Sequence, residues 1–425
     1  MIQIIHNDPK ALKKMLDRSQ LNLGNVNTIV QNILSDVKTY GDSKVIAYTE
    51  KFDLVKLTDL KVSEQDIKEA FDRIDPILLE DLKKAKANIE AYHVNQMIKP
   101  YTLKPEEGIT LSQLVKPIEN VGIYVPGGTA AYPSTVLMNA VPAKIAGVKK
   151  IVMITPPNKA GKIKDSLLVA ASIAGVNDIY KVGGAQGVAA LAYGTQTIPK
   201  VDKIVGPGNI YVAMAKKMVS GYVGIDMIAG PSEILIIADE HANPDYIAAD
   251  LMSQAEHDVL SAAICITTSK DLAKRVKLSL ESQITLLERK DIIKQSLNNY
   301  GAIVITTTLD EAIDLANQIA PEHLELLVEN PFELVDFIQN AGSVFLGAYT
   351  PEPVGDYFAG PNHTLPTSGT SRFSSGLSTA DFLKKTSVSY YSEQALSRAK
   401  DSIIRLAQEE GLTAHANAVA IRFKE

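Results

Sequence analysis

Tryptophan is absent from this chain of 425 residues, and cysteine occurs only once, as Cys265. A single cysteine excludes a disulfide within the chain. It stands in "SAAICITTS", an apolar, β-branched stretch that is typical of a buried strand. We therefore interpret Cys265 as a core residue and not as a nucleophile.

Long apolar runs and an excess of basic charge are also missing. No run reaches the roughly 18 residues of a membrane helix, and the start, "MIQIIHNDPKALKK", lacks the apolar core of a secretion signal. The net charge of -6 argues against a nucleic-acid partner. An apolar fraction of 46% with 22% charged residues is typical of a folded protein. These features predict a cytoplasmic protein that binds neither nucleic acid nor membrane.

The sequence pattern predicts an α/β fold with two incomplete Rossmann-like parallel-sheet lobes and small helical segments at both termini. Residues 1–100 have helical spacing of apolar positions, whereas "KKIVMITPP", "SEILIIAD", "AAICITTS", "GAIVITTT" and "GSVFLG" have the composition of strands. The polar, Gly- and Pro-rich stretch 347–378 is too long for a plain connector and indicates a functional loop. We expect four parts: a helical segment 1–20, a discontinuous catalytic lobe 21–123 with 232–377, a cofactor lobe 124–231, and a helical segment 378–425.

Three glycine turns lie in the cofactor lobe, namely "VPGGTAAYPS", "VGGAQG" and "VGPGNI". Such turns between strands and helices bring backbone N–H groups close to a ligand. None has the full G-x-G-x-x-G pattern, because Tyr211 takes the place of its last glycine. The residues alone leave open both a dinucleotide site and tight turns without a ligand.

The seven histidines divide into two groups. His6, His93 and His241 lie in polar surroundings, and we expect them on the surface. The other four each have a carboxylate or an amide nearby: His257 in "SQAEHD", His323 in "APEHLEL", His363 in "GPNHTLPT" and His415 in "LTAHANA".

The first of these motifs indicates a possible metal site. We expect a helix that begins after Asn243 and continues through "SQAEHD", so that Gln254 and His257, three residues apart, share a face. Asp356 and His415 would complete a nitrogen and oxygen ligand set suited to zinc. A histidine that interacts with the end of the helix is the alternative interpretation.

Glu322 and His323 place two proton-transfer groups side by side. In a helix or turn their side chains would diverge by about 100° and need not bond to each other. They could therefore serve two different protons. A turn with solvated polar groups is the alternative that these two residues leave open.

Taken in order, eight blocks of the sequence resemble the signature of histidinol dehydrogenases. The blocks are "YVPGGTAAYPSTVLMNAVPAKIAGV", "VGGAQGVAALAYGT", "VGPGN", "AGPSEILIIAD", "SQAEHD", "APEHLEL", "GDYFAGPNHTLPTSGTSRFSSGLS" and "EEGLTAHANAVAIR". The resemblance covers residues 20 to 423. It implies the oxidation of L-histidinol to L-histidine in two NAD-dependent steps through L-histidinaldehyde, the final step of histidine biosynthesis.

The resemblance also implies a role for particular positions. One zinc ion per subunit would be bound by Gln254, His257, Asp356 and His415 and would orient the substrate. NAD contacts would fall on Tyr124, Gln186 and Asn209. Substrate contacts would come from the zinc ligands together with Ser232, His323 and Glu410.

The resemblance also implies a division of labour between the two adjacent residues. His323 would be the general base in both oxidations, and Glu322 would activate the water that adds to the aldehyde. The family is dimeric, so His415 and Glu410 are expected to reach the active site of a partner subunit. His363 is placed behind the metal ligands or against the substrate. Small residues exchange places at Ala359 and Ser371 relative to the family pattern, and neither carries an assigned role.

Two other classes of function could use some of the same residues. A zinc hydrolase could combine the Gln, His, Asp and His set with Glu322, but it would have no use for three glycine turns. A ligand-binding protein of two lobes would bind a small molecule without turnover. Absorbance at 340 nm with histidinol and NAD distinguishes both from a dehydrogenase.

Overall fold

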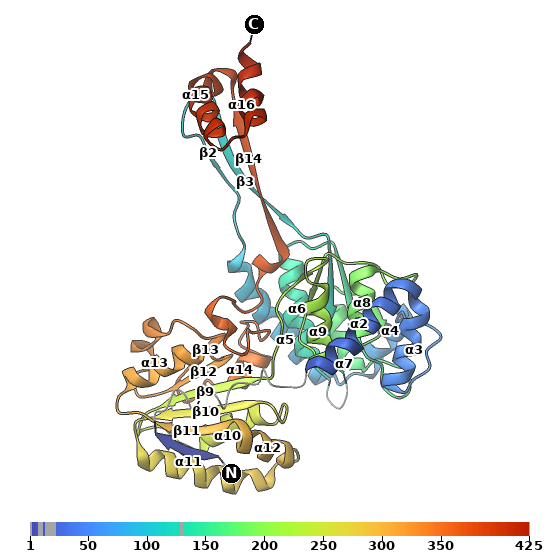
Figure 1. The fold of residues 1–425 in the computed structure, drawn as a ribbon. Helices are drawn as coiled ribbons and strands as arrows, with labels where there is room; N and C mark the ends of the chain where they lie inside the picture. The colour runs from blue at the N-terminus through green and yellow to red at the C-terminus, as the bar shows by residue number, and fades with distance from the viewer. Residues whose placement is uncertain (1, 7–11, 13–22, 128–130, 425) are drawn as a thin grey trace.

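Two parallel sheets, each flanked by helices, lie beside each other in the computed structural model, and an extended arm rises from between them (Figure 1). The structure describes residues 2–6, 12, 23–127 and 131–424. The α/β class with two parallel-sheet lobes is therefore confirmed. No helix among the described residues combines the length and apolarity that crossing a bilayer requires.

The first sheet, sheet A, has the strand order β1-β11-β10-β9-β12-β13, and all its neighbours are parallel. Its strands are β1 (Gln3–His6), β9 (Glu233–Ala238), β10 (Ala262–Thr267), β11 (Gly301–Ile305), β12 (His323–Leu327) and β13 (Ser343–Leu346). The strands predicted at "SEILIIAD", "AAICITTS", "GAIVITTT" and "GSVFLG" are confirmed as β9, β10, β11 and β13.

The prediction of helix was wrong for residues 3–6 at the N-terminus. These residues form β1, in which Ile4 pairs with Ile303 of β11. Pairing with the edge of a preformed sheet satisfies the backbone of this β-branched segment, so a long-range contact decides its structure. Residues 1, 7–11 and 13–20 of the predicted segment lie outside the described residues.

The second sheet, sheet B, has the order β6-β5-β4-β7-β8 and is also parallel. Its strands are β4 (Asn120–Tyr124), β5 (Lys150–Thr155), β6 (Asp178–Lys181), β7 (Lys203–Val205) and β8 (Gly224–Ile225). Because β5 and β6 lie on one side of β4 and β7 on the other, the strand order reverses at β4. Such a switch point opens a crevice beyond the carboxyl ends of the strands.

Helices cover both sheets and also build the N-terminal quarter of the chain. Several begin as the sequence dictates: Ser63 and Asp66 form a capping box, and Asp75 caps a helix whose first residue is Pro76. Before and within the sheet B region the helices are α2 (Leu23–Tyr40), α3 (Asp42–Asp53), α4 (Glu64–Arg73), α5 (Pro76–His93), α6 (Pro133–Ile145), α7 (Asp165–Ile173), α8 (Gly184–Tyr193) and α9 (Ile210–Val219).

The remaining helices follow β8. They are α10 (Pro244–Ala255), α11 (Lys270–Gln283), α12 (Lys290–Tyr300), α13 (Leu309–Ile319), α14 (Glu352–Tyr357), α15 (Glu393–Glu409) and α16 (Thr413–Ala420). Short 3-10 turns connect the elements: η1 (Val94–Gln96), η2 (Ile284–Leu286), η3 (Pro331–Glu333), η4 (Val335–Phe337), η5 (Thr370–Arg372), η6 (Thr379–Phe382) and η7 (Ile421–Phe423). The predicted functional loop thus contains α14.

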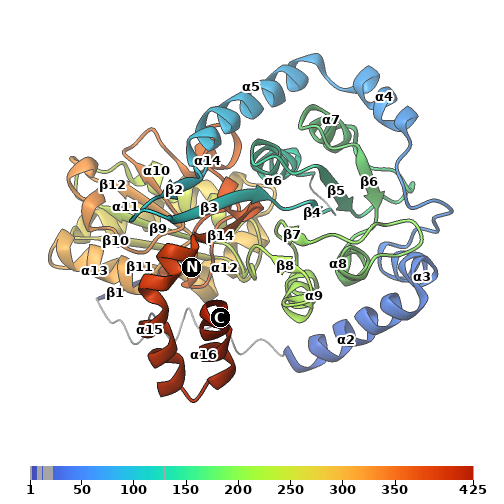
Figure 2. The same cartoon turned by 90° about the horizontal axis from the view of Figure 1, so that it is seen from above.

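Each sheet has an apolar core on both faces. On sheet B, α6 and α7 pack on one face beneath α4 and α5, and α8 and α9 pack on the other beneath α2 and α3 (Figure 2). On sheet A, α10, α11 and α12 share one core, and α13 packs against the opposite face. We expected residues 21–123 to accompany 232–377, but the packing of α2 to α5 lies with sheet B. The division into independent domains stays a prediction.

The arm is an antiparallel sheet that the sequence did not indicate. It consists of β2 (Tyr101–Leu103), β3 (Ile109–Pro117) and β14 (Leu383–Tyr391), and it carries α15 and α16 at its far end (Figure 1). The expected C-terminal helical segment therefore contains a strand of nine residues. Almost every residue of β14 is exposed, so no alternation of buried and exposed residues marks it in the sequence.

Candidate active site

His323 is the first residue of β12, at the amino edge of sheet A, where it pairs in register with Ile234 of β9. Its Nδ1 lies 2.9 Å from the carbonyl oxygen of Glu233. A carbonyl can only accept, so this bond puts the proton on Nδ1 and leaves Nε2 with a lone pair. The buried Nε2 has no hydrogen-bond partner among the described residues.

The protonation state of His323 follows from its burial. Its residue surface is 4% exposed, and burial lowers its pKa to about 4, although the nearby Asp356 acts in the opposite direction. A buried imidazole with a lowered pKa is neutral at pH 7. His323 is therefore neutral at pH 7, with the lone pair of Nε2 available.

Glu322 stands immediately before β12 and is also buried. Its Oε2 accepts a 2.8 Å hydrogen bond from the backbone N–H of Glu233, which fixes the carboxylate at the same edge of the sheet. The distance from Oε2 to Nδ1 of His323 is 3.7 Å, longer than a hydrogen bond. The two groups are neighbours that do not bond to each other through these atoms.

Helix α10 begins as predicted, with the Asn243 side chain accepting from the N–H of Asp245 and with Pro244 as its first residue. It ends at Ala255, earlier than expected, so Gln254 lies in its last turn and His257 just beyond it. Gln254 is buried, and its Nε2 lies 3.2 Å from Nδ1 of His323. Its Oε1 has no hydrogen-bond partner among the described residues.

His257 lies at the exposed rim of this group of residues. The surrounding protein displaces enough water to lower its pKa, and the nearby Asp356 opposes that shift. Asp356, in α14, has its Oδ1 3.6 Å from Nδ1 of His363, and that nitrogen also lies 3.1 Å from the Asp356 carbonyl oxygen. Gln254, His257 and Asp356 thus gather around His323.

Glu352 is a member of this cluster that sequence reasoning missed. It is 2% exposed, and its Oε1 lies 3.9 Å from Nε2 of His323. Burial, followed by the nearby Asp356, raises its pKa to about 10. Its position between two prolines in "TPEPVGD" carried no signal of this role, because only the fold of the 347–378 loop turns the carboxyl inward.

The chemistry of this cluster suits a cation. Possible ligand atoms of His323, Glu352 and Asp356 all lie within 4.8 Å of one another. Oε1 of Gln254 and Oε1 of Glu352 are buried without hydrogen-bond partners among the described residues. Buried oxygens left without partners are costly unless a further group satisfies them, and a divalent ion would do so.

Two predicted site residues lie elsewhere in this chain. His415, on α16, and Glu410, at the end of α15, are exposed at the far end of the arm, away from both sheets (Figure 1). Ser232 directly precedes β9 and therefore shares the amino edge of sheet A with His323. A single chain does not bring His415 and Glu410 to the cluster.

A cavity of about 770 Å³ lies beyond the carboxyl ends of the sheet B strands, and we call it the sheet B cavity. Tyr124, Gln186 and Asn209, the three predicted cofactor contacts, all line it. Each follows from the local fold: Tyr124 ends β4, Gln186 is in the first turn of α8, and the Asn209 side chain caps α9. The three residues thus share one cavity, and their contact with NAD stays a prediction.

The glycine turns let the backbone approach closely around this cavity. Gly206, which follows β7, has a φ of 108°, and a Cβ there would lie 2.2 Å from the carbonyl oxygen of Tyr124. Only glycine tolerates both conditions. A buried ion pair supports the turn, because Lys216 contacts Asp226 and donates to the Gly206 carbonyl at 2.8 Å.

Hydrogen bonds join helix α6 to the 347–378 loop, which carries part of the cluster around His323. Thr135, near the start of α6, has its Oγ1 3.2 Å from Nε2 of His363. Asn362 donates from its side chain to the carbonyl oxygen of Met138. The loop through Pro126 and Gly127, which lines the cavity, leads into this same helix. Helix α6 therefore links the wall of the cavity to the loop that carries Glu352 and Asp356.

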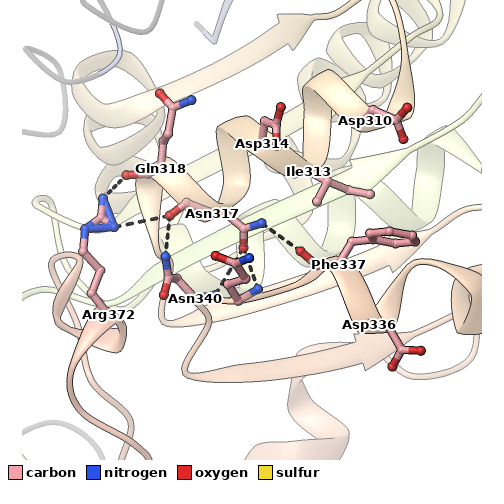
Figure 3. Close-up of a pocket in the computed structure, with 10 residues that line it drawn as sticks. Asp310, Ile313, Asp314, Asn317, Gln318, Asp336, Phe337, Asn340 and Arg372 are labelled. Atoms are coloured by element: carbon pink, nitrogen blue, oxygen red, sulfur yellow. Dashed lines mark hydrogen bonds between the residues drawn. The ribbon is translucent and has the colours of Figure 1, made fainter.

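A second cavity, of about 960 Å³, lies between α13 and the η4 turn (Figure 3). Asn317 is its central bonding residue, donating to the Phe337 carbonyl and accepting from the N–H of Gln339. Arg372 donates to main-chain carbonyls at the end of α13. Within the described part of the chain, no predicted site residue lines this cavity, and its amide and guanidinium groups are used to close the loop onto the helix.

Two residues outside the site also test the sequence interpretation. Cys265 is fully buried in β10, where burial raises its pKa to about 12, so its assignment to the core is confirmed.

His93 was wrongly expected on the surface, since it is fully buried at the end of α5. Its Nδ1 lies 2.9 Å from the Ile89 carbonyl. Its Nε2 lies 3.4 Å from the side-chain nitrogen of Asn362, so the 347–378 loop covers this position.

Comparisons with known proteins agree with this geometry. The family model described as histidinol dehydrogenase matches residues 16–423. A histidinol dehydrogenase of Clostridium acetobutylicum is 57% identical over 395 residues, which cover 93% of this chain and 92% of that protein. One from Bacillus cereus is 54% identical, with 100% of each chain covered. The crystal structure of the enzyme from Elizabethkingia anophelis, 40% identical, superposes with a TM-score of 0.93 over 99% of this chain and 98% of its own.

Proposed function

The chain belongs to the histidinol dehydrogenase family of oxidoreductases, which catalyse the final step of histidine biosynthesis, and from this premise we propose how its residues act. We propose that it oxidises L-histidinol to L-histidine in two NAD-dependent steps, through L-histidinaldehyde. The observation that carries the proposal is the neutral, buried His323, whose Nδ1 bonds to the Glu233 carbonyl while Nε2 keeps a lone pair.

NAD would lie in the sheet B cavity against Tyr124, Gln186 and Asn209. When bound, it supplies a hydride acceptor for each of the two oxidations. The side chain of Asn209 already accepts from the N–H groups of Tyr211 and Val212 as the cap of α9, so its amide nitrogen is the part that can donate to a ligand. The sheet B cavity would therefore bind NAD and orient it.

A zinc ion would be held by Gln254, His257 and Asp356, together with His415 from a second copy of the chain. The unpartnered Oε1 of Gln254 supports this assignment. When bound, the metal holds the substrate in a fixed orientation, which is the templating role of a metal ion. Ser232 and His323 would contact the substrate from the amino edge of sheet A, and Glu410 from the second copy. Shared sites of this kind require a homodimer.

In each oxidation, Nε2 of His323 would take the hydroxyl proton as the hydride leaves the same carbon. In the first the hydroxyl is that of histidinol, and in the second it is that of the hydrated aldehyde. The bond from Nδ1 to the Glu233 carbonyl keeps the ring in the tautomer that this step requires. A positioned base of this kind contributes roughly 10² to 10⁴ in rate.

Between the two oxidations the aldehyde must add water, because only the hydrate carries a hydroxyl beside the remaining hydrogen. Glu322 would take the proton of that water. The backbone N–H of Glu233 holds its carboxylate in place at the edge of sheet A, close to His323. Two adjacent bases therefore suit an enzyme that must remove protons from two different molecules bound at one place.

The test is a stoichiometry measured with the purified protein. With limiting histidinol and excess NAD, absorbance at 340 nm should report two NADH for each histidinol consumed. Removal of the metal with a chelator should abolish the signal, and added zinc should restore it. Formation of one NADH per histidinol, or of none, would contradict the proposal. Hydrolysis of an ester or amide substrate without NAD would instead favour a zinc hydrolase.

A variant tests the role of His323 directly. We expect His323→Gln to lower kcat by at least about 10²-fold with little change in the KM for NAD, because the lost group handles a proton and does not line the sheet B cavity. His241→Gln, at an exposed histidine, is the control and should retain full activity. Retention of wild-type kcat by His323→Gln would contradict the assignment of the base.

A further inference from the structure

Part of the wall of the sheet B cavity is not explained by the residues discussed so far. This part is built by α2 and α3, the helices that cover the α8 and α9 face of sheet B (Figure 2). Ile29 and Ile33 of α2 and Phe52 of α3 make it apolar. An apolar wall suits an adenine ring, so the adenosine half of a dinucleotide would lie here.

Asp53 stands in this wall and is the last residue of α3. A carboxylate at the carboxyl end of a helix faces the negative end of the helix dipole, which disfavours its charge. Its Oδ2 atom is buried without a hydrogen-bond partner among the described residues. Burial raises the pKa of Asp53 to about 6. Asp53 is thus partly desolvated, and its Oδ2 atom is left without a hydrogen bond from the described residues.

Three exposed lysines line the same cavity as the partly buried Asp53. Lys159, Lys162 and Lys164 lie on the loop before α7, line the cavity and are exposed. They offer positive charge for the two phosphates of a dinucleotide. Among the described residues nothing donates a hydrogen bond to Oδ2 of Asp53, so none of these lysines bonds to that atom. Asp53 instead adjoins Tyr124, whose pKa it helps to raise.

A buried carboxylate oxygen that lacks a hydrogen-bond partner and belongs to a cavity wall is best explained by a ligand that donates to it. Carboxylates accept hydrogen bonds from hydroxyl groups, and other dinucleotide-binding folds use an acidic side chain to bind the ribose hydroxyls. A phosphate on the same ribose would bring two negative charges together. We propose that Asp53 accepts hydrogen bonds from the ribose hydroxyls of the adenosine half of NAD and thereby excludes NADP. This inference rests on the proposed placement of NAD in the sheet B cavity.

Two substitutions distinguish the loss of the hydrogen-bond acceptor from the loss of its negative charge. Asp53→Ala removes the acceptor and should weaken NAD binding about tenfold. Asp53→Asn keeps an oxygen acceptor and removes the charge, so it should improve NADP binding and shrink the preference for NAD at least tenfold. Both affinities are measured by calorimetry, without turnover. Glu50→Gln, at an exposed position of the same helix that does not line the cavity, is the matched control and should bind as the wild type does.

Thermal unfolding without ligand shows whether the Asp53 variants fold normally. Because Asp53 is desolvated and unpaired, Asp53→Asn should be at least as stable as the wild type, and NAD should raise its Tm less. Wild-type binding of NAD that both Asp53 variants reproduce within twofold would overturn this inference alone. Failure of the wild type to bind NAD at all would instead overturn the proposed function.

Discussion

At the scale of single residues, the sequence shows which side chains can transfer protons, and the fold decides where they lie. Glu322 and His323 were selected because two proton-transfer groups stand together, and the structure places both at one buried edge of sheet A, while their catalytic roles stay a prediction. The surface prediction for His93 was wrong because its neighbours along the chain are polar, whereas Asn362, far away in the sequence, lies against its ring. Glu352 was missed for the same reason. Residue type can be read from a sequence, but burial depends on the fold.

The buried His93 predicts how stability depends on pH. Burial lowers its pKa below the ordinary 6.5, so the unfolded chain binds a proton more readily than the folded one does. The stability that the neutral ring provides is complete above about pH 6.5 and is lost as the pH falls below that value. His93→Gln cannot titrate, so its Tm should fall less than that of the wild type between pH 7 and pH 5.

At pH 7 the same variant should be less stable by roughly 1–3 kcal/mol, because the hydrogen bond to Ile89 and the packing are disturbed. His241→Gln, an exposed control, should follow the wild-type pH curve. Equal pH slopes for the wild type and His93→Gln would show that His93 does not carry this dependence.

At the scale of elements, the parallel strands were predictable because their apolar, β-branched residues form short runs bounded by turns. The arm strand β14 was not, because its nearly uniform exposure produces no alternating pattern. The two sheets also differ in a way that no run of residues reveals. Sheet B offers the carboxyl ends of its strands to the site, as at Tyr124, whereas sheet A offers its amino ends, as at His323. Long-range topology fixes which edge faces the cleft.

The glycine turn after β7 gives a prediction at this scale. In Gly206→Ala, the new Cβ would lie 2.2 Å from the Tyr124 carbonyl at a φ of 108°, so β7 and β4 must separate. We expect a loss of about 3 kcal/mol or more in the free energy of unfolding, measured with urea, and weaker NAD binding.

Gly221→Ala is the matched control, because its φ of 92° is equally unfavourable while no atom lies within 4 Å of the added carbon. It should lose only the conformational strain, about 1 kcal/mol. If the two variants lost the same free energy, backbone strain and not the approach of β7 to β4 would set the effect.

At the scale of the whole molecule, a single chain does not have His415 and Glu410 at the candidate site. The sequence placed them in the site by resemblance, and the single chain holds them at the end of the arm (Figure 1). No spacing rule could have joined residues so far apart in the sequence, and the single chain does not bring them to the cluster. The homodimer with shared sites is therefore a proposal about assembly.

Mixed subunits test that proposal. A His323→Ala chain and a His415→Ala chain should each be inactive alone. Co-assembled, they should regain up to about one half of the wild-type activity per heterodimer, because one of its two sites has an intact His323 and an intact His415. The measurement is NADH production by heterodimers isolated with two different affinity tags. Isolated heterodimers without activity would show that both histidines act within one chain.

The uncovered arm has a consequence for how a newly made chain behaves. Tyr390 and Tyr391 of β14, and Tyr101 and Leu103 of β2, are exposed. Exposed apolar side chains that lie together favour unspecific association with other proteins. A newly made chain would therefore be prone to aggregate through β2 and β14 until another surface covers them.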